Sequence, residues 1–369
     1  MAHITTPSVD SPRLRFPLLD LARIVAALAV VFFHWCFLFG VDAPATQFRP
    51  WPEFYAWSKY GHLGVQLFFM ISGFLVLQTA YSKTVATFIR ARAVRLYPAF
   101  VACCTLSYLL ISLIPNEPHS VITLLYNLTM LNGVVDPFRG VAPTYIDGSY
   151  WTLALEWKFY VLIALLIATR QLSRVERCLW LWLAASCVYF IYPSAWLELL
   201  CLTPWNAYFV GGAAFFRGRT QGWTVSRCAL VFGALIFGAL QAGRQSEELT
   251  AMYNVEFDKL VSVAWIAAFF ALFFLLTNPA IRFNRSAIRL LTLAGALSYP
   301  IYLLHLRLGA AAVRAFWTLG DRFLLLVAML AALMLAAYAV HRFVERPVWR
   351  VLHRRVVRVD KGISSTGAP

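Results

Sequence analysis

Two ionisable side chains, Arg23 and His34, lie in the apolar stretch LDLARIVAALAVVFFHW at residues 19–35. On an α-helix they share one face, roughly 16 Å apart along the axis. Ionisable groups inside a membrane are costly and are often functional, so the pair indicates a polar path with Arg23 at its mouth and His34 deep inside. The alternative is structural: Arg23 pairs with Asp20, and His34 is a hydrogen-bonded core histidine.

A carboxylate, Glu156, lies in the segment GSYWTLALEWKFY, at a depth similar to that of His34 in its own predicted helix. Thr152 and Tyr160 lie one helical turn away on either side. A buried carboxylate without a cation or a hydrogen-bond donor is driven to its neutral form. Glu156 is therefore predicted to face polar groups inside the protein, and Lys158 points about 160° away from it.

A third polar stripe runs through LSYPIYLLH, where Ser298, Tyr302 and His305 follow one another at helical spacing. Pro300 breaks the stripe and leaves its local geometry open. Such a stripe fits hydrogen bonding between membrane helices as well as it fits a reactive site.

A basic run, IRARAVRLYP, places Arg92 and Arg95 three residues apart. Basic residues of this kind commonly mark a cytoplasmic loop, and that interpretation is sufficient for the run alone. Arginine is also the side chain best suited to bind phosphate through two hydrogen bonds. The run therefore fits an anionic cytoplasmic cosubstrate.

The elements that position these side chains are those of an integral membrane protein. Of the 369 residues, 61% are hydrophobic and only 13% are charged, whereas soluble domains are roughly half apolar. The first apolar run is too long for the core of a signal peptide, and no small-residue cleavage site follows it. It is expected to remain as a spanning helix.

Ten stretches approach the roughly 20 apolar residues that a membrane span requires. The predicted fold is therefore all-α and polytopic, with a transmembrane domain at 18–347 between an N-terminal segment at 1–17 and a basic tail at 348–369. A further apolar patch at 121–135 is predicted to be interfacial or re-entrant. The predicted spans are 18–39, 62–81, 96–114, 150–169, 178–193, 197–216, 228–243, 260–277, 288–313 and 322–341.

The distribution of basic residues predicts the orientation. With the N-terminus inside, the cytoplasmic segments hold 22 Lys and Arg and the opposite loops hold six. Cytoplasmic loops retain basic residues, so both termini are predicted to be cytoplasmic. The net charge of +15 is thereby explained by topology and anionic lipid, and no nucleic-acid partner is expected.

The seven cysteines all lie in or beside apolar runs, without a C-x-x-C pair or a histidine at ligand spacing. They are predicted to be small buried hydrophobic residues, and neither disulfides nor a metal site are expected.

Six motifs, in order between residues 19 and 347, together resemble the acyltransferase 3 family of bacterial membrane proteins. Each is weak alone, and their order makes the resemblance specific. They are LDLARIVAALAVVFFH, GHLGVQLFFMISGF, RARAVRLYP, YWTLALEWKFY, LSYPIYLLH and VERP.

The resemblance implies an O-acyltransferase in the bacterial inner membrane. Such an enzyme moves an acyl group, usually acetyl, from cytoplasmic acyl-CoA to a hydroxyl of an exported or surface glycan, such as an exopolysaccharide, a lipopolysaccharide or a lipid-linked sugar. Acyl-CoA, the glycan and membrane lipids are the expected partners, and no metal is expected.

Within this interpretation, His34 is the predicted general base or transient acyl carrier, and Glu156 is its orienting or charge-stabilising partner. Arg23, Arg92 and Arg95 are predicted to hold the CoA phosphates. Substrate contact or oxyanion stabilisation is predicted for Ser72, Trp151, Ser298, Tyr302 and His305.

The alternative is a transporter or flippase of a polar lipid or glycan precursor, because buried ionisable residues in ten helices suit one equally well. Weak symmetry between two halves is expected of such a protein and is not evident in the sequence. The acceptor glycan and its acylated position, the choice between acetyl and succinyl donors, a covalent intermediate and the oligomeric state all stay open.

Overall fold

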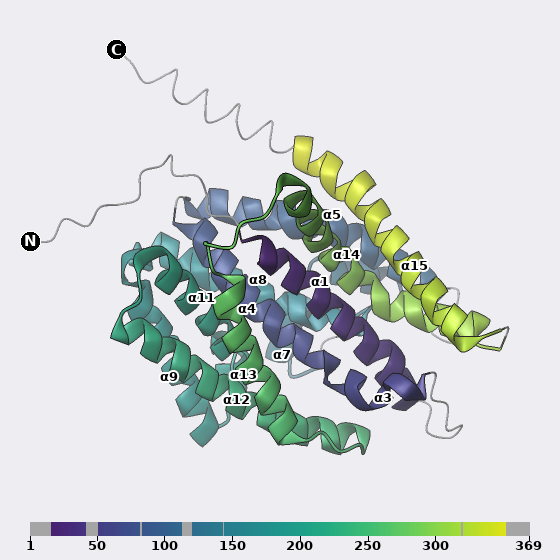
Figure 1. The fold of residues 1–369 in the computed structure, drawn as a ribbon, viewed down its shortest axis with the longest axis horizontal. Coiled ribbons are helices and arrows are strands. Elements are labelled where there is room, and N and C mark those ends of the chain that lie inside the picture. The colour runs from purple at the N-terminus through teal and green to yellow at the C-terminus, as the bar shows by residue number, and fades with distance from the viewer. Residues whose placement is uncertain are drawn as a thin grey trace, which may run out of the picture.

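The computed structural model of the chain describes residues 16–41, 51–81, 83–112, 120–142, 144–318 and 320–351. These residues form helices joined by short connections, and no strand occurs among them (Figure 1). The predicted all-α class is therefore confirmed. Most of the predicted segments 1–17 and 348–369 lies outside the described residues.

The first half of the chain contributes the helices that later form the site. The first helix, α1, ends in a π-helical turn, and α4 is preceded by two short helical elements that continue into it. The elements are α1 (Pro17–Phe32), η1 (Phe33–Leu38), α2 (Phe39–Val41), α3 (Pro52–Ser58), η3 (Lys59–Leu63), α4 (Gly64–Ala80), α5 (Val85–Ser112), α6 (Val121–Leu128), α7 (Asn132–Phe138), η4 (Gly148–Tyr150) and α8 (Trp151–Ala168).

The second half begins with a group of helices on one side of the bundle and returns to α1 through α14. The elements are η5 (Gln171–Arg174), α9 (Val175–Ile191), α10 (Ala195–Cys201), α11 (Asn206–Gln221), α12 (Val225–Tyr253), α13 (Lys259–Leu276), α14 (Arg285–Phe316), α15 (Arg322–Val340) and η6 (His341–Glu345). In Figure 1, α15 lies at one edge of the bundle, and α9 and α12 lie toward the opposite edge.

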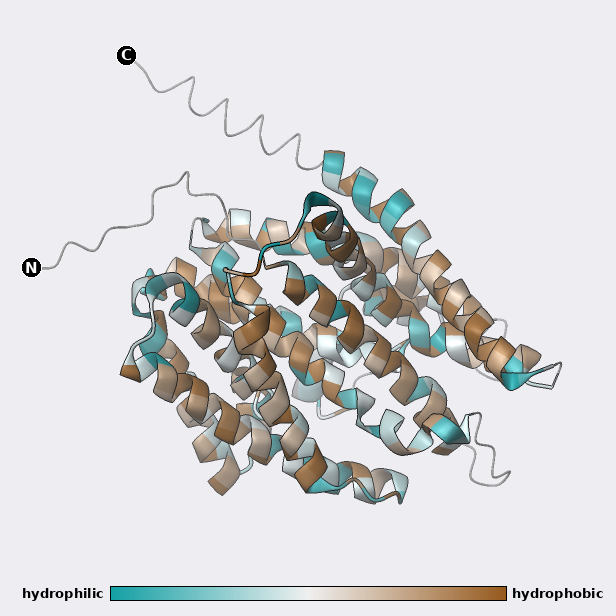
Figure 2. Cartoon of the chain, in the orientation of Figure 1, coloured by the Kyte–Doolittle hydropathy of each residue, from teal (hydrophilic) through white to brown (hydrophobic). Residues whose placement is uncertain are grey.

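Nine helical segments within the described ranges are long and apolar enough to cross a membrane. Figure 2 shows apolar residues along the helices and polar residues gathered at helix ends and connections, including η6 and the helical turn that follows it after α15. The predicted span at 178–193 corresponds to α9, which has only 17 residues. The multi-pass helical architecture is thus as expected, whereas the count of ten and the orientation stay predictions.

The apolar patch predicted as interfacial or re-entrant forms two short helices, α6 and α7. Ser120 caps α6, since its side chain accepts a hydrogen bond from the Thr123 amide. The helix α6 packs against α5, and α7 packs against α8. The patch is therefore a short helical pair beside the site-forming helices.

Small residues allow the closest helix contacts. A Cβ atom added at Gly73 in α4 would lie 2.1 Å from the carbonyl oxygen of Phe209, and one added at Gly212 in α11 would lie 1.9 Å from that of Met70. Backbone therefore packs directly on backbone between α4 and α11, as is common in membrane helix pairs. This contact holds α4 against the second half of the chain.

The helix α14 runs without interruption through Pro300, where the sequence left the local geometry open. A proline inside a membrane helix is tolerated where neighbouring groups satisfy the freed carbonyl. The prediction that all the cysteines are buried needs correction. All seven cysteines are free, but Cys187 and Cys228 are exposed on the helix surface. An apolar residue on a membrane-facing helix surface is stable without burial inside the protein, which composition alone does not distinguish.

Candidate active site

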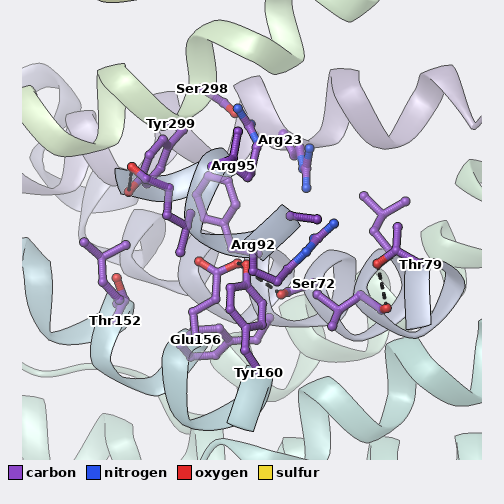
Figure 3. Close-up of a pocket in the computed structure, with 18 of the residues that line it drawn as sticks. Arg23, Ser72, Thr79, Arg92, Arg95, Thr152, Glu156, Tyr160, Ser298 and Tyr299 are labelled. Carbon is purple, nitrogen blue, oxygen red and sulfur yellow. Dashed lines mark hydrogen bonds between the residues drawn. The ribbon is translucent and has the colours of Figure 1, made fainter. Parts of the chain in front are cut away.

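A cavity of about 730 Å³ is lined by residues of α1, α4, α5, α8 and α14 (Figure 3). The three arginines predicted to hold phosphates, Arg23 from α1 and Arg92 and Arg95 from α5, all line it. Its other polar or aromatic lining residues are Phe68, Phe69, Ser72, Thr79, Lys83, Thr87, Arg90, Thr152, Glu156, Tyr160, Ser298, Tyr299, Tyr302 and Trp349.

The cavity has two ends of different character. Lys83, Arg90 and Trp349 line the end that the charge distribution predicts to be cytoplasmic. Thr152 and Tyr302 line the opposite, deeper end. Lys83, Arg90 and Trp349 were not predicted as site residues from the sequence, because basic residues and a tryptophan at helix ends are common in any membrane protein.

The arginines of the cavity are only partly neutralised. Arg23 Nη1 lies 4.0 Å from Asp20 Oδ1, the pairing considered from the sequence, and Arg95 Nη1 lies 3.4 Å from Glu345 Oε1. The Arg92 guanidinium lies 5.7 Å from the centre of the Tyr160 ring, and its Nε is buried without a hydrogen-bond partner. A buried, unsatisfied donor on a cation is costly, so it marks a position where an anion would be stabilised.

Glu156 is the one carboxylate among the described residues that line the cavity. Its Oε1 accepts hydrogen bonds from the Tyr160 hydroxyl at 2.5 Å and the Ser72 hydroxyl at 3.3 Å (Figure 3). The described hydrogen-bond partners of Glu156 are these two hydroxyls, so His34 is not directly hydrogen bonded to it in this structure. The carboxylate faces the arginines because α8 turns this side toward α4 and α5.

His34 does not line the cavity, so the predicted path shared by Arg23 and His34 is not continuous in this structure. Its Nδ1 lies 2.9 Å from the carbonyl oxygen of Val30 and 3.1 Å from Nε2 of His305. Rings of α14 lie between it and the cavity: the centroid of His305 is 4.7 Å from that of His34 and 5.6 Å from that of Tyr302. His34 lies in η1, the π-helical continuation of α1, and helical spacing could not reveal the α14 side chains that separate it from the cavity.

The predicted stripe on α14 divides between two environments. Ser298 and Tyr302 line the cavity, whereas His305 is fully buried beside His34. The Tyr302 hydroxyl lies 2.9 Å from that of Thr152 and 3.0 Å from the carbonyl oxygen of Ser149. Part of the stripe therefore joins helices through hydrogen bonds, as the structural interpretation expected.

Two further predicted contacts have local partners. Ser298 donates to the carbonyl oxygen of Gly295 at 2.7 Å, one turn earlier in α14. Trp151 is not among the residues that line the cavity, and its ring packs against that of Trp205 at 5.0 Å. Trp151 therefore holds α8 against α11, and no substrate contact follows from its position.

A buried carboxylate, Asp147, was missed from the sequence. It accepts hydrogen bonds from the amide and the hydroxyl of Ser149, at 2.9 Å and 2.6 Å, and from the Arg307 amide at 3.3 Å. Complete burial raises the pKa of the Asp147 carboxyl, although the hydrogen bonds from Ser149 and the charge of Arg307 act in the opposite direction. An aspartate before a helix is an ordinary N-cap residue, which is why it gave no signal.

Within the described ranges, no group of three or more histidine, cysteine, aspartate or glutamate side chains is arranged to hold a metal ion. The residues of the cavity are instead those of a site for an anionic organic molecule, with arginines toward one end and hydroxyl groups toward the other.

The comparisons with known proteins agree with this class of site. The acyltransferase domain family, acyltransferase 3, matches residues 16–342. An O-acetyl transferase of Shigella phage Sf6 is 26% identical over 232 residues, which cover 59% of this chain and 67% of the phage protein. A protein of Rhizobium radiobacter named protein 2 in the picA locus is 41% identical over 104 residues, which cover 26% of this chain and 46% of that protein. No solved structure matches.

The fold and the cavity are those of a multi-pass membrane protein with an arginine-lined cavity between its helices. The chain belongs to the acyltransferase 3 family and is an acyltransferase. Of the two function classes predicted from the sequence, the enzyme is therefore correct.

Proposed function

We propose that this protein transfers an acetyl group from cytoplasmic acetyl-CoA to a sugar hydroxyl of a surface or exported polysaccharide or a lipid-linked glycan. The observation that carries the proposal is the arginine cavity, in which the buried Nε of Arg92 lacks a partner. The name of the phage relative, an O-acetyl transferase, supports acetyl as the group and a hydroxyl as its acceptor. The bacterial inner membrane is the compartment in which acyl-CoA and exported glycan precursors meet.

The charge of the cavity lining and the order of the residues along the cavity both fit acetyl-CoA as the donor. Five cationic side chains face one carboxylate in the lining, so a polyanion is favoured. Arg23, Arg92 and Arg95 would hold the CoA phosphates by charge-assisted hydrogen bonds. The uncharged arm of the donor would then extend along α4, past Phe68, toward Thr152 and Tyr302 at the deep end.

The acyl transfer itself is assigned to His34. As general base it takes the proton of the acceptor hydroxyl while that oxygen attacks the thioester carbonyl carbon. The carbon–sulfur bond then breaks, and the thiolate leaves as CoA thiol with the proton returned from His34. Because Tyr302 and His305 lie between the cavity and His34, donor binding must displace these side chains before the acyl group reaches the base.

Glu156 has a different role in this proposal from the one expected from the sequence. It faces the arginines and is hydrogen bonded to Tyr160 and Ser72, so it partly neutralises the cavity before the donor enters. Ser298 and Tyr302 line the same cavity and lie on α14, the helix that also carries His305. Their hydroxyls are the oxyanion donors that the proposal retains.

The test is transfer by the purified protein in proteoliposomes, with labelled acetyl-CoA inside and a panel of glycan acceptors outside. We expect label in the glycan, and His34→Ala to lower the rate by about two to four powers of ten because a positioned base is lost. Its thermal stability and donor KM serve as controls for folding. A His34→Ala protein that transfers acetyl at the original rate contradicts the assignment, and a native protein that transports glycan without acyl-CoA contradicts the function.

Loss of one acetyl mass from surface glycans after deletion in the host would identify the acceptor.

A further inference from the structure

The buried pair formed by His34 and His305 has a defined arrangement of hydrogens. Nδ1 of His305 lies 2.7 Å from the carbonyl oxygen of Tyr302. A carbonyl oxygen only accepts, so this nitrogen carries the hydrogen. His305 is fully buried and lies among the rings of Tyr302 and His34, where a charged imidazole is costly. Its Nε2 is therefore an unprotonated acceptor.

The same reasoning fixes His34. Its Nδ1 lies 2.9 Å from the Val30 carbonyl oxygen and 3.1 Å from Nε2 of His305, so two acceptors face one nitrogen. That nitrogen must carry the hydrogen, because otherwise its lone pair would face two others. In the neutral imidazole the remaining nitrogen, Nε2, is then the basic one.

The helical segments that carry His34 and His305 pack closely against each other. The Trp35 indole donates from Nε1 to the His305 carbonyl oxygen at 2.8 Å, which joins η1 to α14 directly beside both histidines. A Cβ atom added at Gly309 would lie 2.1 Å from that same Nε1, so the indole packs against α14 backbone. The separation of the two imidazoles is thus set by a packed helix contact.

We infer that His305 is a positioning residue that, together with the Val30 carbonyl oxygen, holds His34 in its Nδ1-protonated tautomer and is the side-chain acceptor for Nδ1 when His34 becomes charged. This inference rests on the proposed function, since it assigns a role to His305 only if His34 is the base. The acceptor hydroxyl loses its proton to Nε2 of His34, and the same proton leaves with the thiol. His305 itself neither gains nor loses a proton in the cycle.

Two substitutions of similar size separate this role from simple helix packing. The amide of glutamine reaches the place of Nε2, so His305→Gln keeps an acceptor for His34 and loses the contact with Tyr302. The amide of asparagine lies near the place of Nδ1, so His305→Asn keeps a donor for Tyr302 and loses the acceptor. A positioning role and a packing role therefore predict opposite orders of activity.

His62 supplies a matched control. It is also buried, at 8% exposure, and its Nδ1 bonds a carbonyl oxygen three residues earlier, that of Lys59, at 2.7 Å. The hydrogen bonds described for His62 do not include His34. His62→Asn thus repeats the change in volume and in local bonding without removing an acceptor from the proposed base.

The experiment measures kcat and donor KM of acetyl transfer for the native protein, the two His305 variants and His62→Asn, all with thermal stability monitored. We expect His305→Asn to lose roughly 10- to 150-fold in kcat with donor KM unchanged, because Nδ1 of the charged His34 then keeps only the Val30 carbonyl oxygen as an acceptor, and a hydrogen bond to a charged group contributes about 1.5 to 3 kcal/mol. His305→Gln should recover most of that loss, and His62→Asn should retain the native kcat.

Equal kcat values for the two His305 variants, or higher activity in the asparagine variant, would overturn the inference while the proposed function stands. A native protein without acyl-CoA-dependent transfer would instead remove the proposed function. If neither His305 variant folds, the same comparison is made with His305→Met, which fills the volume without a strong acceptor; native kcat in that variant also overturns the inference.

Discussion

Two groups of arginines in this protein have opposite surroundings. Arg217 in α11 and Arg227 in α12 share one carboxylate, that of Glu176 in α9, with nitrogen–oxygen distances of 2.7 Å for each. Arg217 also donates to the Tyr81 hydroxyl at 2.9 Å, and Arg227 donates to two backbone carbonyl oxygens. This group is satisfied within the protein and joins three helices.

The arginines of the cavity are the reverse case. Arg92 has a buried Nε without a partner, and the nearest carboxylate of Arg23 lies 4.0 Å away. Glu156 directs its described hydrogen bonds to hydroxyl groups, although it faces the same cavity. The two groups therefore differ in the number of hydrogen-bond acceptors around each arginine and in exposure, since Arg217 and Arg227 are buried whereas Arg23, Arg92 and Arg95 are partly exposed to the cavity.

The contacts of Glu176 with Arg217 and Arg227 determine the charge of that carboxyl. Partial burial raises the pKa of the Glu176 carboxyl, but the hydrogen bonds and charges of Arg217 and Arg227 outweigh it, so that the pKa lies below its ordinary value. Glu176 therefore stays ionised at neutral pH, and the group needs no external anion.

The largest effect on donor binding is expected from Arg92→Ala. Hydrogen bonds to charged groups contribute about 1.5 to 3 kcal/mol, so loss of the guanidinium should raise the KM for acetyl-CoA roughly 10- to 150-fold. The measurement is steady-state transfer at varied donor concentration. The control is Arg217→Ala, and an unchanged donor KM for Arg92→Ala would break the comparison between the two groups.

Arg217→Ala should act on stability instead. It leaves Glu176 with one cation where it had two, at a site only partly exposed, which should lower the free energy of unfolding by about 2 kcal/mol. Thermal unfolding in detergent measures this loss. The KM for acetyl-CoA should remain at the native value; a rise comparable to that of Arg92→Ala would mean that both groups bind the donor.

The smallest effect is expected from Glu156→Gln. Removing the negative charge from the cavity should tighten binding of free CoA, measured as its inhibition constant, by a few-fold, because one like charge no longer opposes the phosphates. Weaker CoA binding would contradict this expectation. It would show that Glu156 orients the arginines for the phosphates instead of opposing the phosphates by its charge.

Much of the fold could be predicted from the sequence, because the length and polarity of membrane helices are set by the bilayer. The helices carrying Arg23, Glu156 and Tyr302 all form where apolar runs of spanning length occur. The 17-residue α9 shows the limit of this reasoning, since burial within a bundle also favours short apolar helices.

The candidate site was predicted in part. Arg23, Arg92 and Arg95 share a cavity, as expected from residue type. The partners of His34 and Glu156 were not predictable, because helical spacing gives the face of a residue but not which neighbouring helix covers that face. Asp147 was hidden for a related reason: a cap and a buried carboxylate beside a site have the same local sequence.

The central claim is that the arginine cavity holds the acyl donor. The most direct measurement is an experimental structure of the protein with CoA bound in a lipid nanodisc. The account predicts density for the CoA phosphates within hydrogen-bonding distance of Arg23, Arg92 and Arg95, with the thiol directed toward Tyr302. CoA density outside this cavity, with the Arg92 Nε still lacking an acceptor, would contradict it.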